Sequence, residues 1–220
     1  MEPTRRPRVK VCCIQDEAEA WTAIRLGASA LGLVSAMPSG PGVIPEDAIA
    51  RIAARVPPGV ATFLLTSLQD AGAIADQQRR LRTTAVQIVD RLGRGSYAEL
   101  REALPGVGLV QVVHVTGPES VEEAIAVAPH VDALLLDSGN PALAVKELGG
   151  TGRRHDWSLS RRIRESAPVP VYLAGGLRPE NVSEAIEAVG PFALDICTGV
   201  RTGGRLDAAK LERFMAAAQA

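Results

Sequence analysis

Short runs of apolar, often β-branched residues alternate with longer amphipathic segments along the whole chain. The short runs predict strands, and the amphipathic segments between them predict helices. This alternation indicates parallel β/α units, of which the sequence predicts eight. The predicted strands are Val9–Ile14, Ala30–Ala36, Ala61–Thr66, Ala85–Val89, Leu109–Val115, Ala133–Asp137, Val169–Ala174 and Ala193–Cys197.

Two of the predicted helices have clear boundary signals. The segment from Pro45 begins with proline and two acidic residues, which favour a helix N-terminus, and continues with apolar residues at helical spacing. The segment from Arg178 ends at Gly190, a residue type that favours the left-handed conformation after a helix. Even repetition without a long crossover favours a closed barrel over an open sheet. The sequence therefore predicts an α/β fold, a single-domain (β/α)8 TIM barrel over residues 9–220 after a short N-terminal extension at residues 1–8.

Composition narrows the classes of partner. The chain has 220 residues, 46% of them hydrophobic, which is enough for one substantial core. A net charge of -1 gives no general attraction to nucleic acid or to an anionic membrane. Apolar runs fall short of the ~20 residues of a membrane span, and we recognise no export signal. Three cysteines, two of them adjacent, fit a reducing cytoplasm. We expect a cytoplasmic protein, and no ligand spacing implies a metal or an organic cofactor.

The expected ligand site lies at the carboxyl ends of the strands, where barrels of this kind bind their substrates. Gly175 and Gly176 follow the seventh predicted strand, and Thr198 and Gly199 follow the eighth. Small residues at neighbouring strand ends let backbone N–H groups converge on an anion. The sequence therefore predicts a phosphate site there, with tight turns as the purely structural alternative.

Two strand ends carry candidate acid and base groups. Lys10 and Cys12 share one face of the first predicted strand, so a nearby ammonium group could make the Cys12 thiol a general base. The structural alternative is a small buried core residue. Asp137 ends a very apolar strand, where burial favours a protonated carboxyl that can act as an acid; capping of Ser138 is the alternative. A base and an acid facing each other across a barrel mouth suit an aldose–ketose isomerisation, in which one proton leaves C2′ and another reaches the opening ring oxygen.

These motifs, in this order, resemble the phosphoribosylanthranilate isomerase family from Val9 to Ala217. VKVCCI resembles the family's KICGI start, LLLDS its acid-bearing segment, GGTGRRHDW at residues 149–157 its GGTG loop, LAGGLRPENV its phosphate loop and DICTGV its DVSSGV segment. The resemblance implies a cofactor-free Amadori rearrangement of N-(5′-phosphoribosyl)anthranilate in tryptophan biosynthesis, with Cys12 as base and Asp137 as acid. It also allows a homodimer, since barrels of this kind occur as monomers and as dimers.

Several positions differ from the family pattern. Pro41 stands where the family has an arginine that pairs with the substrate carboxylate, Cys13 replaces a glycine, and Arg201 replaces a glutamate. Gln87-Ile88-Val89-Asp90 stands in place of QLHG on the fourth strand.

We therefore take Lys10, Gln87, His155 and Arg201 as candidate substrate-binding residues. Arg153, Arg154 and Lys146 are further candidate cations for a substrate carboxylate, although single loop cations are commonly solvated. The structural alternative for His155 is ordering of the long connection from Ser138 to Trp157. Two other functions stay open: a related barrel acting on a different phosphorylated sugar, and a non-catalytic protein that binds a phosphorylated small molecule.

Overall fold

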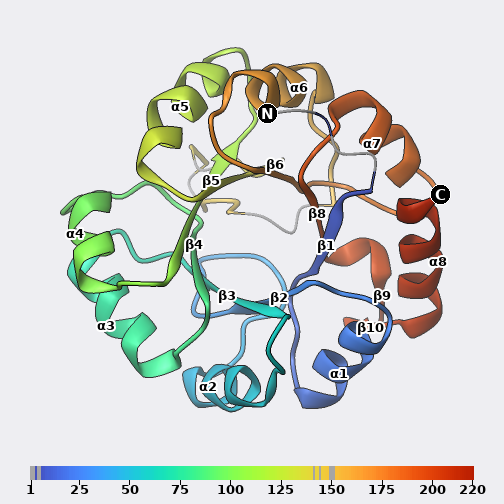
Figure 1. Ribbon diagram of the computed structural model, residues 1–220, viewed down its shortest axis with the longest axis horizontal. Helices are drawn as coiled ribbons and strands as arrows, with labels where there is room; N and C mark the ends of the chain where they lie inside the picture. The colour runs from blue at the N-terminus through green and yellow to red at the C-terminus, as the bar shows by residue number, and fades with distance from the viewer. Residues whose placement is uncertain (1–2, 4–5, 141, 144, 149–151) are drawn as a thin grey trace.

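Strands β1 to β8 close into a parallel barrel in the computed structural model, which describes residues 3, 6–140, 142–143, 145–148 and 152–220. Neighbours in sequence are neighbours in the barrel, and β8 pairs back onto β1. Figure 1 shows the ring of strands surrounded by helices. The strands are β1 (Arg8–Val11), β2 (Ala30–Val34), β3 (Ala61–Thr66), β4 (Ala85–Ile88), β5 (Gly108–His114), β6 (Ala133–Asp137), β7 (Val171–Leu173) and β8 (Ala193–Ile196).

A helix follows each barrel strand, and several helices carry their own N-terminal caps. The side chains of Asp16, Asp70 and Asp207 accept hydrogen bonds from backbone N–H groups three residues on, which satisfies donors that a helix start leaves unpaired. The helices are α1 (Glu17–Arg25), α2 (Glu46–Arg55), α3 (Ala71–Leu81), α4 (Tyr97–Ala103), α5 (Glu119–Val127), α6 (Trp157–Ser166), α7 (Val182–Val189) and α8 (Ala208–Gln219). Shorter elements are η1 (Ala128–His130), η2 (Thr198–Val200), β9 (Arg201–Thr202) and β10 (Arg205–Leu206).

Side chains alternate between two apolar regions along each strand. On β6, Leu134 and Leu136 pack outward against the helices, whereas Ala133 and Leu135 point into the barrel. Small residues such as Ala133 and a few larger ones fill the interior, so the barrel is a packed core with a pocket at the carboxyl ends of its strands.

The α/β barrel predicted from the alternating pattern is confirmed. Strand ends differ by a few residues: β1 ends at Val11 rather than Ile14, and β2 at Val34 rather than Ala36. Beyond β1, Cys12, Cys13 and Ile14 are buried in the connection at the barrel mouth, whereas Ala36 beyond β2 is exposed. At the other end β1 begins at Arg8, the last residue of the predicted extension. Among the described residues, no helix is long and apolar enough to span a bilayer.

Candidate active site

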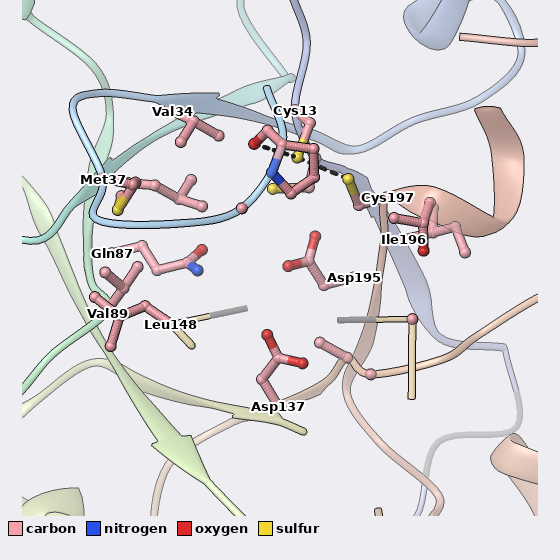
Figure 2. Close-up of a pocket in the computed structure, with 18 of the residues that line it drawn as sticks. Cys13, Val34, Met37, Gln87, Val89, Asp137, Leu148, Asp195, Ile196 and Cys197 are labelled. Carbon is pink, nitrogen blue, oxygen red and sulfur yellow. Dashed lines mark hydrogen bonds between the residues drawn. The ribbon is translucent and has the colours of Figure 1, made fainter. Parts of the chain in front are cut away.

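A pocket of about 700 Å³, including its open mouth, lies at the carboxyl ends of the strands. Cys12, directly after β1, lines it together with Gln87 on β4 and Asp137 on β6, although the three are far apart in the sequence. Figure 2 shows the side chains of Gln87, Asp137 and Asp195 pointing toward the middle of this pocket. The structure therefore brings the candidate base and the candidate acid into one cavity.

Cys12 lies beside a buried cation. A Cβ atom added to Gly32 would meet the Cys12 sulfur at 2.7 Å and the Lys10 ammonium nitrogen at 3.1 Å, so both atoms approach the same point. Lys10 is fully buried below the pocket lining, and its Nζ donates to Asp195 Oδ1 at 2.8 Å. Burial disfavours its charge, but Asp195 and the neighbouring thiols raise the pKa of Lys10 above its ordinary value. The amine therefore stays protonated at neutral pH.

The electrostatic surroundings of Cys12 favour a thiolate. A hydrogen bond from the Cys13 side chain is the largest effect that lowers the pKa of Cys12. Burial opposes this effect, and the positive charge of Lys10 adds to it. The net result is a pKa below the ordinary thiol value, as a general base at neutral pH requires.

Asp137 has the opposite tendency. Burial raises the pKa of its carboxyl above the ordinary value, while the Ser138 N–H, which donates to Oδ1 at 2.7 Å, partly offsets that shift. The carboxylate of Asp195 raises the pKa of Asp137 further, because two negative charges in one pocket repel. Asp137 therefore caps Ser138 and also holds a proton more readily than an exposed aspartate does.

The predicted phosphate loops lie on one side of the pocket. Gly175 and Gly176 have φ angles of 83° and 65°, which favour glycine, and both line the pocket together with Thr198. A Cβ atom on Gly176 would lie 2.7 Å from the backbone of Arg153, so the loop needs glycine for space as well as for conformation. Gly199 follows in η2, outside the pocket lining. Of the resembling loop at 149–157, Gly149, Gly150 and Thr151 lie outside the described residues.

Gln87 is the clearest unsatisfied polar group in the pocket. Its side chain is 3% exposed, and its Oε1 accepts no hydrogen bond from the described residues. An unpaired buried acceptor is costly, so a bound donor would stabilise it. This geometry suits a ligand hydroxyl or amine.

The other candidate residues lie outside the pocket lining. His155 is buried, and its Nε2 lies 2.7 Å from Ser160 Oγ on α6, so it orders the long connection. Arg201 is buried in an ion pair with Glu19 and donates to the backbone carbonyls of Cys12 and Cys13. Its guanidinium thus fixes the end of β1 from behind. The three loop cations pair with acidic partners: Lys146 with Asp90, Arg153 with Glu147 and Arg154 with Glu184.

Asp195 is a pocket residue that the sequence analysis did not select. It lies on β8 and bonds to Lys10, and Figure 2 shows its side chain and that of Asp137 both pointing into the pocket. A signal was present, because period-two alternation of ALDI puts the carboxylate on the interior face between two outward apolar residues. In the described part of the chain, no group of three His, Cys, Asp or Glu side chains is placed to hold a metal ion.

Comparison with known proteins gives one consistent result. A family model described as N-(5'phosphoribosyl)anthranilate (PRA) isomerase matches residues 9–217. The N-(5'-phosphoribosyl)anthranilate isomerase of Methanothrix thermoacetophila is 37% identical over 214 residues, covering 94% of this chain and 96% of its own. The enzyme of that name from Haloarcula marismortui is 37% identical over 213 residues, covering 94% of each chain.

Solved structures of similar fold and related sequence carry the same name. The phosphoribosyl anthranilate isomerase of Thermotoga maritima superimposes with a TM-score of 0.79 at 28% identity, over 96% of this chain and 98% of its own. A phosphoribosyl anthranilate isomerase in complex with reduced 1-(o-carboxyphenylamino)-1-deoxyribulose 5-phosphate gives a TM-score of 0.77 at 27% identity, with the same coverage. With a family match over nearly its whole length and close relatives of one name, this chain belongs to the N-(5′-phosphoribosyl)anthranilate isomerase family.

Proposed function

We propose that this chain converts N-(5′-phosphoribosyl)anthranilate to its 1-deoxyribulose isomer, with Cys12 as general base and Asp137 as general acid. The observation that supports these roles is a thiol of lowered pKa and a carboxyl of raised pKa in one pocket. Environments that move two titratable groups in opposite directions are typical of acid–base pairs. Family membership gives the reaction and its place in tryptophan biosynthesis.

The two roles account for the first two proton transfers of the rearrangement. Asp137 donates a proton to the ribose ring oxygen as the C1′–O bond breaks, which leaves an iminium between C1′ and the anthranilate nitrogen. The Cys12 thiolate then removes the C2′ proton to form an enolamine. The enol loses its hydroxyl proton and C1′ gains one, so the product is a ketone with the same atoms as the substrate. Four protons move in all: Asp137 and Cys12 transfer the first two, and the tautomerisation of the enolamine to the ketone accounts for the other two.

The phosphate group of the substrate is placed, in this proposal, against the amides of Gly175, Gly176, Thr198 and Gly199. Two loops of small residues meet there. The 5-phosphate ligand named with one relative has the group that this site would hold. Gln87 accepts a hydrogen bond from a substrate hydroxyl or amine through its unpaired Oε1.

A second candidate function rests on one observation about charge. Pro41 lies in the pocket wall where the resemblance puts an arginine, and no lysine or arginine is among the described residues lining the pocket. A buried carboxylate without a cation is costly. The alternative is therefore a related isomerase whose phosphorylated sugar substrate has no carboxylate in this position.

The setting of the reaction follows from the same features. We propose a cytoplasmic enzyme without nucleic-acid partners, because charge is balanced and the three cysteines are free thiols. We also propose a homodimer, as the Thermotoga maritima isomerase is described as dimeric. Exposed apolar side chains, Val43, Leu68, Leu143 and Val145, lie on connections at the barrel mouth and offer a surface. Light scattering would then give twice the chain mass of 23.1 kDa.

Turnover of N-(5′-phosphoribosyl)anthranilate tests the proposed roles directly. We expect the wild-type chain to form the product, and Cys12→Ser and Asp137→Asn each to lower kcat by about a hundredfold to ten-thousandfold. Product formation in either variant at the wild-type rate would remove that residue from the mechanism.

A binding control separates lost chemistry from lost structure. Both substitutions are close to isosteric, so both variants should bind the reduced 5-phosphate analogue. Tight binding by the wild-type chain without any turnover would favour the non-catalytic alternative. Turnover of a sugar phosphate that lacks the carboxylate would favour the second isomerase.

A further inference from the structure

Two thiols from opposite ends of the sequence meet in the wall of the pocket. The Cys13 and Cys197 sulfur atoms are 2.7 Å apart, and Figure 2 shows them facing each other. Cys13 follows β1 and Cys197 follows β8, so the contact lies where the barrel closes. Both are free thiols, and neither transfers a proton in the mechanism above.

The backbone around this pair is fixed on both sides. The Cys12 N–H donates to Ile196 O at 2.8 Å, so the residues next to the two cysteines are already bonded to each other. Arg201 donates to the Cys13 carbonyl from behind. Little conformational freedom is left to lose when these side chains become linked.

Space and backbone conformation direct the Cys13 side chain toward Cys197. Cys13 has a left-handed φ of 63°. A Cβ atom on Gly42 would lie 2.4 Å from the Cys13 Cβ and 2.9 Å from its sulfur, so a side chain at position 42 would push Cys13 away. The loop from Ser39 to Val43 therefore leaves room for this thiol only because residue 42 is glycine.

We propose that Cys13 and Cys197 form a site of reversible oxidation, at which a hydroperoxide converts the two thiols to a disulfide. A disulfide has its sulfur atoms about 2.05 Å apart, so the pair needs to close by roughly 0.7 Å. Side-chain rotation can supply a movement of this size without shifting either strand.

The oxidation balances with hydrogen peroxide as the oxidant. Cys197 is the more exposed of the two thiols, so its thiolate attacks one peroxide oxygen. The O–O bond breaks, and the leaving hydroxide takes a proton to become water. Cys13 then gives its proton to Cys12 and attacks the sulfur of the Cys197 sulfenic acid. The S–O bond breaks, and the leaving hydroxide takes the proton back from Cys12 to become the second water. Two thiols and one peroxide thus give one disulfide and two waters.

Oxidation has a consequence for the site, and this step rests on the proposed function. The reduced Cys13 thiol lowers the pKa of Cys12, and the disulfide removes the S–H group of Cys13 that has this effect. The link also joins the residue after the base to the residue before Thr198 in the phosphate loop. We expect kcat at neutral pH to fall by roughly tenfold to a hundredfold, since hydrogen bonds to charged groups are among the stronger ones.

The disulfide itself is detected without any activity measurement. The wild-type chain, treated with limiting hydrogen peroxide, should lose two of its three free thiols and the mass of two hydrogen atoms. Digestion should give one linked peptide pair joining the residue 12–13 segment to the Cys197 segment, which a dithiol reductant separates. Cys12→Ser should give the same linked pair more slowly, whereas Cys13→Ser and Cys197→Ser should give none.

Any other product of the peroxide treatment would overturn the proposal. Retention of all three thiols, a link that contains Cys12, a link between two chains, or gain of oxygen without a link would each exclude the site. Isomerase activity is then measured before and after oxidation, separately for the wild type and for each variant. A loss of activity that is reversed by the reductant should occur only in chains that have both Cys13 and Cys197. A wild-type chain that forms the link and keeps its full rate excludes the effect on activity. Full activity in reduced Cys12→Ser instead contradicts the proposed function and leaves the link untouched.

Discussion

Cys13 adopts a left-handed backbone conformation directly after the proposed base. Non-glycine residues in this region are strained by about 1 kcal/mol or more, yet the thiol here stabilises the Cys12 thiolate. The same residue therefore costs stability and supports the base.

Replacing Cys13 by glycine or by alanine separates these two effects. Both substitutions remove the thiol donor, which raises the pKa of Cys12, so the acid-side rise of the kcat profile should move to higher pH in both. Only glycine relieves the backbone strain, so Cys13→Gly should be about 1 kcal/mol more stable than Cys13→Ala. Rates measured across pH and denaturant unfolding check the two parts, and an acid-side rise that stays in place in both variants would contradict the role of the thiol.

His155 gives the fold a separate dependence on pH. Burial lowers the pKa of His155 to about 4, below the 6.5 of an unperturbed histidine. The unfolded chain therefore binds more protons between these values, so this contribution to stability is complete above pH 6.5 and is lost as pH falls toward 4. Between pH 7 and pH 5 we expect a loss of about 2 kcal/mol in the free energy of unfolding from this residue.

Substitution of His155 by glutamine should remove that part of the pH dependence while keeping a polar group near Ser160. His130 is exposed, and His130→Gln should keep the wild-type difference between the two pH values. Urea unfolding at pH 5 and at pH 7 measures this difference in the free energy of unfolding. If the free energy of unfolding changes equally between the two pH values in the wild type and in His155→Gln, another group is responsible for the pH dependence.

At the scale of elements, the connection from β1 to α1 is held by a buried ion pair. Arg201 in β9 bonds to Glu19 in α1 at 3.2 Å and to the Cys12 carbonyl at 3.2 Å, and both charged side chains are almost fully buried. Without Arg201, the buried Glu19 carboxylate would keep only the more exposed Arg205 as an ionic partner, and loss of a buried partner is costly. The pair therefore ties three elements together behind the base.

Arg201→Gln should lower the free energy of unfolding by about 3 kcal/mol and should also lower kcat, because the end of β1 loses its support. The matched control is Arg51→Gln, which breaks a pair with Asp47 on the exposed surface of α2 and should change neither quantity measurably. Chemical denaturation and steady-state rates at one pH give both values. A change in stability with an unchanged kcat would mean that Arg201 supports the fold alone.

Elements were predictable from the sequence because their signals are local. Period-two alternation placed Lys10 and Cys12 on one interior face, and Gly190 marked a helix end that the structure has with φ of 62°. Strand ends were predicted too long at β1 and β2, and at β1 the reason is that residues buried at a barrel mouth are as apolar as those in a strand. Arg201 could not be placed in this way, because its partners Glu19 and Cys12 are distant in sequence and depend on closure.

At the scale of the molecule, the chemistry gathers where the barrel closes between β1 and β8. The Lys10–Asp195 pair, the Cys13–Cys197 contact and the Arg201 bond to the Cys12 carbonyl all cross this seam. The proposed phosphate loop after β8 begins one residue beyond this seam. Closure of the fold and assembly of the site are therefore one event, so ligand binding and global stability should be coupled.

This coupling should appear as a measurable increase in the free energy of unfolding when a ligand is added. A ligand that binds only the folded chain stabilises it by about 2.7 kcal/mol at a hundred times its Kd, and the reduced 5-phosphate analogue is the probe. Gly176→Ala should lose most of this increment, because a Cβ there meets the Arg153 backbone at 2.7 Å and displaces the loop. Gly203 has the same kind of left-handed φ, 56°, with nothing within 4 Å of an added Cβ, so Gly203→Ala introduces similar strain away from the pocket.

Comparing the two alanine variants separates strain from binding, since both start from a lowered stability. Gly203→Ala should gain the full increment on adding the analogue, and Gly176→Ala should gain little at the same concentration, as followed by thermal unfolding with and without ligand. Equal increments in the two variants would place the phosphate group elsewhere. The proposed roles of Cys12 and Asp137 would then need a substrate held in another orientation, because the phosphate contact fixes which carbon faces the thiol.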